Sequence, residues 1–224
     1  MGIAKIFGRL RKVPEPGHLE KFDSSRASGL VEIRIDLAIP KQEKSLWCWV
    51  AVGSGVADFY QVEVPTQCRT ASRVLGRPDS ACCQSGDKVC NQLGYLHKTL
   101  AHFECYVDYD EGALAPERIE SELQASRPIG VRVKWRRGSA RNMGHFVALA
   151  GIKTGRETVD VIVMDPAEGT TSVVSHHALE SDYGPDGGSW THSFFTISPQ
   201  EAALSGGAPG TEALAATPEL LGGA

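Results

Sequence analysis

The chain changes character at Pro128. After this proline, short segments rich in β-branched and aromatic residues alternate with turns that contain Gly, Arg and Asp, a pattern that predicts strands. Before it, the pattern is mostly helical. Segregation of this kind favours an α+β fold in which helices pack on an antiparallel sheet. We expect strands at residues 129–135, 144–152, 159–164, 170–174 and 190–197.

The first part of the chain has four segments with helical periodicity and two short strands. Pro116 fits the first turn of a helix, and Asn91 is a candidate cap for another. We expect helices at residues 50–60, 67–75, 91–103 and from 116 onward, strands at 31–37 and 105–109, and a loop over 82–90.

Both ends of the chain differ in composition from the middle. Residues 1–30 read as an N-terminal extension and linker, in which the basic amphipathic residues 3–12 could make weak contact with a membrane surface or a partner. From Ser198 the chain is mostly Ala, Gly, Pro and Glu, so we expect residues 198–224 to be disordered. One domain over residues 31–197 is left.

The composition argues against several functional classes. A formal net charge of −4 disfavours general nucleic-acid binding, which needs a basic footprint. No run of about 18 apolar residues is present, so we expect no transmembrane segment. The N-terminus lacks the apolar core of a signal peptide. We therefore expect a cytoplasmic protein, or one exported without a signal peptide by a dedicated secretion system.

A single cysteine, Cys48, lies at the start of a predicted helix, directly after a polar loop. A helix N-terminus has free N–H groups and partial positive charge. These favour a thiolate, which is the nucleophilic form of cysteine. Ser45 is a candidate N-cap for this helix. The alternative is that Cys48 is a small buried apolar residue, as many free cysteines are.

A thiolate nucleophile needs a base, and the base needs an orienting group. His145 begins a very apolar predicted strand, after Gly144, and a glycine there allows close approach of a substrate or another backbone. Asp165 ends the next predicted strand. Each residue alone has a purely structural interpretation, since an acid before proline is often a turn former. If the two strands pair as a hairpin, however, His145 and Asp165 lie near the same end of the sheet.

Taken together, these residues resemble the motifs of papain-like cysteine peptidases. The motifs are, in chain order, Gln42, Trp47-Cys48-Trp49, Gly144-His145-Phe146 and Asp165-Pro166. A closer resemblance, to the subgroup typified by the bacterial effector protease AvrRpt2, comes from Thr66-Gln67-Cys68, Cys82-Cys83 and Cys90-Asn91. The likeness spans roughly residues 40–196.

The resemblance implies a papain-like fold, with a helical lobe packed against an antiparallel β-sheet lobe. It also implies a peptidase that hydrolyses peptide bonds of a protein or peptide substrate through an acyl-thioester, without a cofactor. Cys48 would be the nucleophile, His145 the base and later the acid, Asp165 the residue that orients the imidazole, and Gln42 a donor to the oxyanion. The residues expected to line the substrate cleft are Trp47, Trp49 and Gly144.

Two other functions fit the same residues or the same fold. Acyl transfer or glutamine deamidation, as in transglutaminase-like toxins or effectors, uses the same Cys, His and Asp and differs in the second nucleophile. A catalytically inactive binding module on a papain-like fold is the other. It predicts that Cys48 reacts no faster than a free thiol.

Five further cysteines lie in the mostly helical part, and an odd number cannot all pair within the chain. Disulfides formed after export are the favoured interpretation, and reduced buried thiols are the next. A zinc site with His97 or His102 is disfavoured, because there is no C-x-x-C motif and adjacent cysteines rarely both reach one tetrahedral ion. The candidates for disulfide bonds are Cys68, Cys82, Cys83, Cys90 and Cys105.

Overall fold

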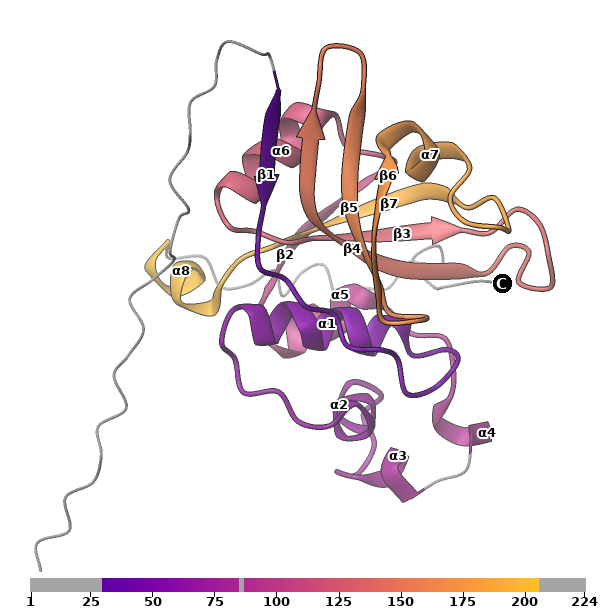
Figure 1. The fold of residues 1–224 in the computed structure, drawn as a ribbon. Coiled ribbons are helices and arrows are strands. Elements are labelled where there is room, and N and C mark those ends of the chain that lie inside the picture. Colours follow the sequence, from indigo (N-terminus) through magenta and orange to yellow (C-terminus); the bar gives the residue numbers. More distant parts are fainter. Residues whose placement is uncertain (1–29, 85–86, 206–224) are drawn as a thin grey trace, which may run out of the picture.

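The computed structural model describes residues 30–84 and 87–205. Its strands form one antiparallel sheet in the order β2-β7-β3-β4-β5-β6, and β1 pairs with the last part of β4 (Figure 1). The strands are β1 (Val31–Arg34), β2 (Tyr106–Glu111), β3 (Ile129–Lys134), β4 (Gly144–Thr154), β5 (Val159–Asp165), β6 (Thr170–Ser175) and β7 (Ser189–Thr196).

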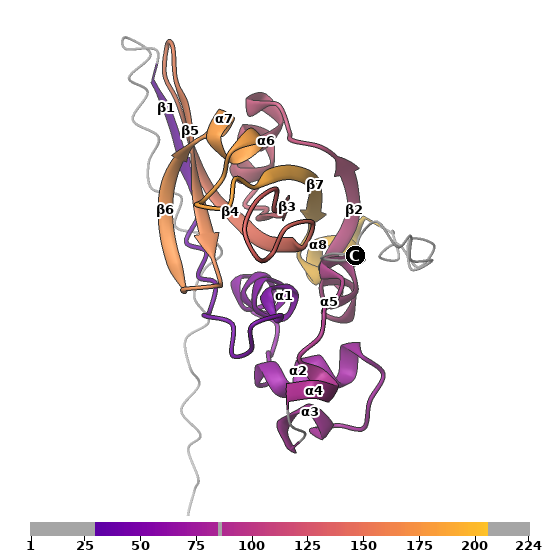
Figure 2. The ribbon, with the colours of Figure 1, turned by 90° about the vertical axis from the view of Figure 1, so that its right-hand side faces the viewer.

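The helices lie on both sides of this sheet. Figures 1 and 2 both show α1 and α5 directly beneath it, with α2, α3 and α4 farther away, whereas α6 and α7 lie at the opposite side. The helices are α1 (Cys48–Phe59), α2 (Gln67–Val74), α3 (Ala81–Gln84), α4 (Asp87–Cys90), α5 (Leu96–His102), α6 (Pro116–Gln124), α7 (His176–Ser181) and α8 (Pro199–Leu204). None of the described helices combines the length and the apolar composition needed to cross a bilayer.

The core fills the space between α1 and the sheet. Ten consecutive residues of α1, Cys48–Ala57, are buried, because this helix is enclosed by α5 and by β4. Gly53 allows this close packing, since a Cβ there would lie 2.4 Å from the Thr99 side chain of α5. The α+β expectation, with helices packed on an antiparallel sheet, is confirmed.

Strand β4 is the longest strand and changes partner along its length. Its first half pairs with β3, from Lys134 opposite Gly144 to Ile129 opposite Leu149, and its last residues pair with β1. On its other edge it forms a hairpin with β5. This hairpin is the one the sequence suggested, and it brings the start of β4 and the end of β5 to the same end of the sheet.

Several local expectations are wrong. The predicted loop over 82–90 contains the short helices α3 and α4. Helix α5 begins at Leu96 rather than at Asn91, because the Asn91 side chain bonds to the loop before α1 instead of capping a helix. Helix α7 was not predicted at all. Pro116 does occupy the first turn of α6 as expected, and Ile119 and Leu123 of this helix are buried.

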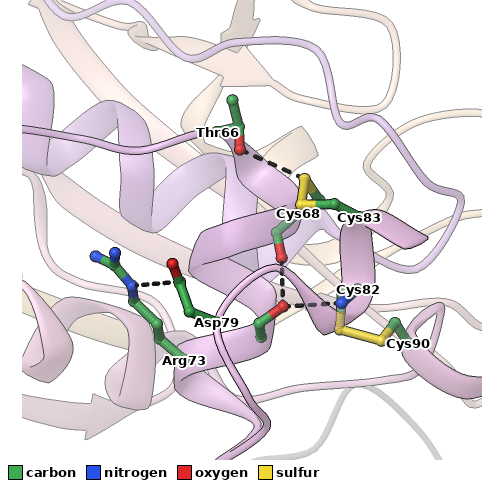
Figure 3. Close-up of a disulfide and its surroundings, with 8 residues drawn as sticks. Thr66, Cys68, Arg73, Asp79, Cys82, Cys83 and Cys90 are labelled. Atoms are coloured by element: carbon green, nitrogen blue, oxygen red, sulfur yellow. Dashed lines mark hydrogen bonds and ion pairs between the residues drawn. A yellow bond between two sulfur atoms is a disulfide. The ribbon is translucent and has the colours of Figure 1, made fainter. Parts of the chain in front are cut away.

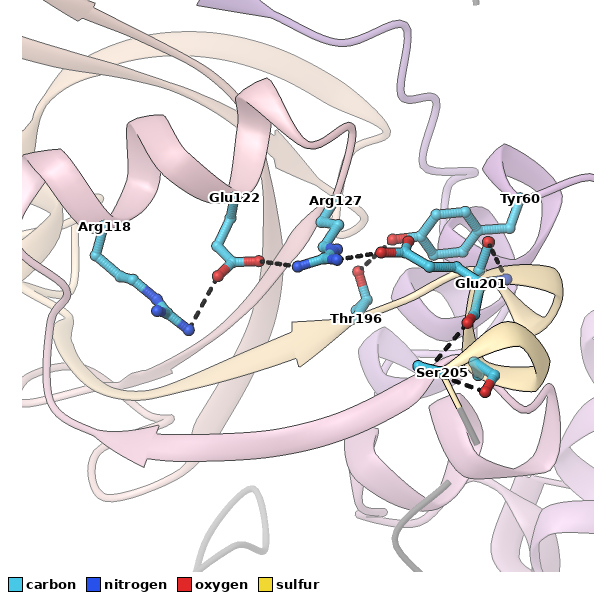
Figure 4. A network of polar contacts seen from close by, with 9 residues as sticks. Tyr60, Arg118, Glu122, Arg127, Thr196, Glu201 and Ser205 are labelled. Atoms are coloured by element: carbon cyan, nitrogen blue, oxygen red, sulfur yellow. Dashed lines mark hydrogen bonds and ion pairs between the residues drawn. The ribbon is translucent and has the colours of Figure 1, made fainter. Parts of the chain in front are cut away.

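The end of the domain also needs correction, since residues 198–205 do not belong to a disordered tail. Ser198 caps α8 by accepting from the backbone N–H of Glu201, and the Glu201 carboxylate pairs with Arg127. Arg127 also faces Glu122, which pairs with Arg118 at 2.9 Å, and together they join α8 to α6 (Figure 4). Residues 206–224 and the amphipathic segment 3–12 lie outside the described residues.

Candidate active site

Cys48 is the first residue of α1. Trp47 occupies the N-cap position without a side-chain cap, so the expectation that Ser45 caps the helix is wrong; the Ser45 hydroxyl instead accepts from the Asn91 amide. The first N–H groups of a helix have no intrahelical partner, so those at Cys48 face a group placed before the helix. Cys48 is 6% exposed.

Gln42 shapes the loop that precedes α1. Its side-chain amide donates to the carbonyls of Lys44 and Ser45, at 2.9 and 2.7 Å, and so uses both of its hydrogens within the loop. Its backbone N–H donates to the carbonyl of Pro166 at 2.8 Å. The loop before Cys48 is thereby tied to the turn after Asp165. In this arrangement the Gln42 amide is not directed at an oxyanion, and that role stays a prediction.

His145 and Asp165 meet at the end of the β4–β5 hairpin. The distance between His145 Nε2 and Asp165 Oδ1 is 2.7 Å. The same carboxylate accepts from the Ala167 backbone N–H at 2.9 Å and, through Oδ2, from the Tyr183 hydroxyl at 2.9 Å. Burial alone would raise the pKa of Asp165, but the hydrogen bond and charge of His145, with these other donors, bring it below the usual value. Asp165 is therefore held as a carboxylate.

The Cys48 thiol lies close enough to the His145 ring to interact with it, and this interaction helps to raise the pKa of His145. Because Asp165 occupies Nε2, the nitrogen left for Cys48 is Nδ1. Burial lowers the pKa of His145, but the hydrogen bond to Asp165, the interaction with Cys48 and the charges of both residues outweigh burial and raise the pKa to about 10. The ring is thus stabilised as an imidazolium between two groups that can carry negative charge.

An indole covers this pair on one side. Trp135 stacks on the His145 ring, with centroids 5.7 Å apart and planes inclined by 20°. It also stacks on the Tyr183 ring, at 6.2 Å and 16°. The aromatic rings fix the imidazole plane and keep water away from its bond to Asp165, which strengthens that bond.

Trp47 and Trp49 do not line a cleft, contrary to the expectation. Both are 1% exposed, and their indole N–H groups donate to the carbonyls of Cys90 and Gln92, at 2.8 and 3.2 Å. They anchor the start of α1 to the segment after α4 instead. Gly144 lies in β4 directly before His145, and its role in substrate contact stays a prediction.

Two disulfides crosslink the small helices beside α1 (Figure 3). Cys68 of α2 pairs with Cys83, and Cys82 pairs with Cys90 at the end of α4. The Ser72 hydroxyl donates to the carbonyl of Cys68 and accepts from the N–H of Cys82, which holds α2 against α3. The second disulfide fixes the residue whose carbonyl accepts from Trp47.

Cys105 is the candidate that forms no disulfide. Its sulfur is fully buried and donates to the carbonyl of Phe103, and burial raises the pKa of this thiol to about 12. The disulfides also argue against the zinc site, because the other four candidate cysteines are bonded to one another. Among the described residues, no three His, Cys, Asp or Glu side chains are grouped as a metal site requires.

Comparison with known proteins agrees with this geometry. The family model described as the papain-like cysteine protease AvrRpt2 matches residues 31–183. The chain belongs to this family. It is therefore a papain-like cysteine protease and a hydrolase, with the α+β fold of that class.

Other comparisons add less. No curated protein matches the chain. One solved structure, from a study of limited antibody cross-reactivity between the mite allergens Blo t 1 and Der p 1, is similar at 12% identity with a TM-score of 0.41. That similarity covers 87% of this chain and 74% of the other.

In this AvrRpt2-type protease, three residues next to the site had not been anticipated. Tyr183 carries no motif that links it to Asp165. Trp135 could have been found, because antiparallel pairing of residues 129–135 with 144–152 places it beside His145. The third is Arg132, a buried guanidinium that donates to the Thr191 hydroxyl at 2.8 Å. It is close enough to Cys48 for their charges to interact.

Proposed function

We propose that Cys48, His145 and Asp165 act as a catalytic triad that hydrolyses peptide bonds of a protein substrate. The observation that supports this most directly is the position of the His145 ring, which bonds to a carboxylate at 2.7 Å and lies within interaction range of the nucleophile candidate Cys48. A thiolate and an imidazolium placed in this way are the reactive form of a cysteine protease.

The reaction would proceed in two halves. The Cys48 thiolate attacks the carbonyl carbon, and the resulting oxyanion accepts from the free N–H of Cys48 at the start of α1. The His145 imidazolium gives its proton to the leaving amine, the C–N bond breaks, and a thioester remains. Neutral His145 then takes a proton from water, the hydroxide attacks the thioester, and the carboxylic acid leaves as the thiolate and imidazolium are restored.

Gln42 is proposed as a second oxyanion donor. This role requires one of its two amide hydrogens to leave the carbonyl of Lys44 or Ser45 when substrate binds. Loss of one oxyanion donor costs on the order of 100- to 1000-fold in rate. A fall of that size in Gln42→Ala, with substrate binding retained, would support the assignment.

We further propose that the catalytic domain runs from β1 through α8 and that the protein works after export. The family match over residues 31–183 and the docking of α8 support these boundaries. The two disulfides support export, because such bonds persist in oxidising surroundings and are rare in the cytosol. A bacterial effector acting on a host protein fits these features.

Digestion of an unbiased peptide library tests the function. Peptides from a chymotryptic digest of a bacterial lysate are incubated with the full chain or with Cys48→Ala, and products are sequenced by mass spectrometry. We expect new peptide termini only with the unaltered chain. Glutamine converted to glutamate, or peptides joined to one another, would instead indicate deamidation or acyl transfer. A chain that leaves the library unchanged would refute the proposal.

A further inference from the structure

A basic pocket lies at the β3–β4 hairpin, and one of its lining residues is Trp135, which stacks on His145. Its volume is about 350 Å³, and it is lined by Lys134, Trp135, Arg136 and Arg141, with Ser189 and Thr191 of β7 among the remaining polar residues. This size is at the lower end of the range for ligand pockets, which begins at about 300 Å³. It is large enough for a side chain of a bound peptide.

The charge of this pocket contrasts with that of the whole chain. Three of its lining residues are cations, and none of the described residues that line it is a carboxylate, whereas the formal net charge of the chain is −4. Arg136 is partly neutralised, since it and Arg137 both bond to Asp182, at 3.1 and 3.0 Å. Lys134 and Arg141 form no ion pair with any described residue. Two exposed cations are thus available to an incoming anion.

The walls of the pocket are held in place by hydrogen bonds. In the hairpin, Trp135 and Asn142 pair through the N–H of Asn142 and the carbonyl of Trp135, at 2.9 Å. Arg136 donates from Nε to the carbonyl of Gly187 at 2.7 Å, which ties the hairpin to the loop before β7. The pocket therefore exists before a ligand arrives, and binding needs little ordering of the protein.

Trp135 gives the pocket its position relative to the chemistry. Trp135 is one of the residues that line the pocket, and its indole stacks on the His145 ring. In a peptidase the imidazolium must reach the nitrogen of the leaving amine. Under the proposed function, the part of the substrate that follows the scissile bond therefore lies on the side of the site where His145 and Trp135 are stacked.

We propose that this pocket binds an acidic side chain of the substrate, located within a few residues after the scissile bond. This inference depends on the proposed function for the direction of the bound peptide, but not for the preference of the pocket for an anion. The contacts would be exposed ion pairs, each worth up to about 1 kcal/mol, so the preference is modest and decreases with salt.

The first experiment is the library digestion, repeated with charge variants. Lys134→Gln/Arg141→Gln removes the two available cations, and Lys153→Gln/Arg156→Gln removes the same charge at the far end of β4. We expect cleavage sites of the unaltered chain to be enriched in Asp and Glu over Asn and Gln within three residues after the cut. The enrichment should fall about tenfold in the first variant and persist in the second. No enrichment, or equal enrichment in both variants, would overturn the proposal.

A binding measurement keeps this test independent of catalysis. N-acetylated tetraglutamate amide and tetraglutamine amide are titrated into Cys48→Ala by calorimetry, with the same charge variants added to that background. We expect the glutamate peptide to bind about tenfold tighter than the glutamine peptide and to lose this advantage only when Lys134 and Arg141 are replaced. Equal affinity for the two peptides would refute the pocket assignment. A chain that binds the glutamate peptide but cleaves nothing would refute the proposed function alone.

Discussion

The hydroxyl of Tyr183 lies 2.9 Å from Oδ2 of Asp165 and donates a hydrogen bond to it. His145 occupies the other oxygen, so the tyrosine fixes the carboxylate in the orientation that the imidazole needs. A hydrogen bond to a charged group contributes about 1.5–3 kcal/mol. If the proposed triad is correct, Tyr183 is a positioning residue for Asp165.

Tyr183→Phe should lower kcat/KM by about tenfold, because the freed carboxylate holds His145 less well. It should also move the acidic limit of activity to higher pH, since the lost hydrogen bond no longer helps to lower the pKa of Asp165. Measured pH profiles of kcat/KM check both effects. Tyr95→Phe, which alters a half-buried tyrosine elsewhere, is the control. If Tyr183→Phe lowers stability but leaves the acidic limit of activity unchanged, Tyr183 has only a structural role in packing.

The raised pKa of His145, about 10, predicts an unusual alkaline limit. Because the imidazolium is the acid in the first half of the reaction, activity should persist through neutral pH and fall as the pH passes about 10. The same group should stabilise the fold fully below its unfolded pKa of about 6.5 and lose that contribution as the pH rises through about 10. Asp165→Asn should shift the activity limit to lower pH. An unchanged limit in that variant would contradict the coupling.

Cys48→Ala should abolish proteolysis and lower the free energy of unfolding by about 1 kcal/mol, since the sulfur is buried at the helix start. Cys105 is an internal reference for reactivity, because it is the other free cysteine among the described residues and burial raises the pKa of its thiol to about 12. Mass spectrometry after brief iodoacetamide treatment at about pH 6 should find label on Cys48 and not on Cys105. Equal, slow labelling of the two would support an inactive binding module.

His97 should make the fold sensitive to acid. It is 1% exposed, neither ring nitrogen has a described hydrogen-bond partner, and burial lowers its pKa to about 4. Because His97 has a lowered pKa in the folded state, it does not reduce the free energy of unfolding at pH values above its unfolded pKa of about 6.5. As the pH falls toward about 4, it reduces this free energy increasingly. The loss is on the order of 2–3 kcal/mol. Denaturant melts of the unaltered chain and His97→Gln should therefore converge at acidic pH. If the stabilities of the two proteins depend on pH in the same way, His97 is not the cause of the acid sensitivity.

The disulfide between Cys82 and Cys90 should matter more for catalysis than the other one, because the carbonyl of Cys90 holds Trp47. Replacing both cysteines by serine should cost about 2–4 kcal/mol of stability and also reduce kcat. Cys68→Ser/Cys83→Ser is the matched control, since the Trp47 indole donates to the carbonyl of Cys90 and not to either of these cysteines. Equal effects on kcat in the two variants would show that the disulfides serve stability alone.

Much of the fold follows from local patterns. The β4–β5 hairpin could be predicted because two apolar runs flank a short turn, and this hairpin alone brings His145 and Asp165 together. The position of α6 followed from Pro116, whose fixed φ suits a first helical turn. In these segments the local preference and the tertiary structure agree.

Where the expectations failed, contacts from distant segments override local preference. Asn91 could cap a helix, but its amide bonds to the loop before Cys48. Helix α8 is short, and the ion pair of Glu201 with Arg127 stabilises it in a segment whose composition suggests disorder. The pairing of the cysteines depends on how α2, α3 and α4 pack, which sequence spacing does not determine.

Strand β4 connects the two parts of the candidate site, because it carries His145 and also pairs with β1. His145 stands at its start, while β1, bonded to its last residues, leads straight into the chain that carries Cys48. Gly151 makes this alignment feasible, because a Cβ there would lie 2.8 Å from the carbonyl oxygen of Ile33. A methyl group at that point would force β1 or the side chain of Ile162 to shift. The absence of a side chain at Gly151 therefore helps to set the position of the chain that leads to the proposed nucleophile.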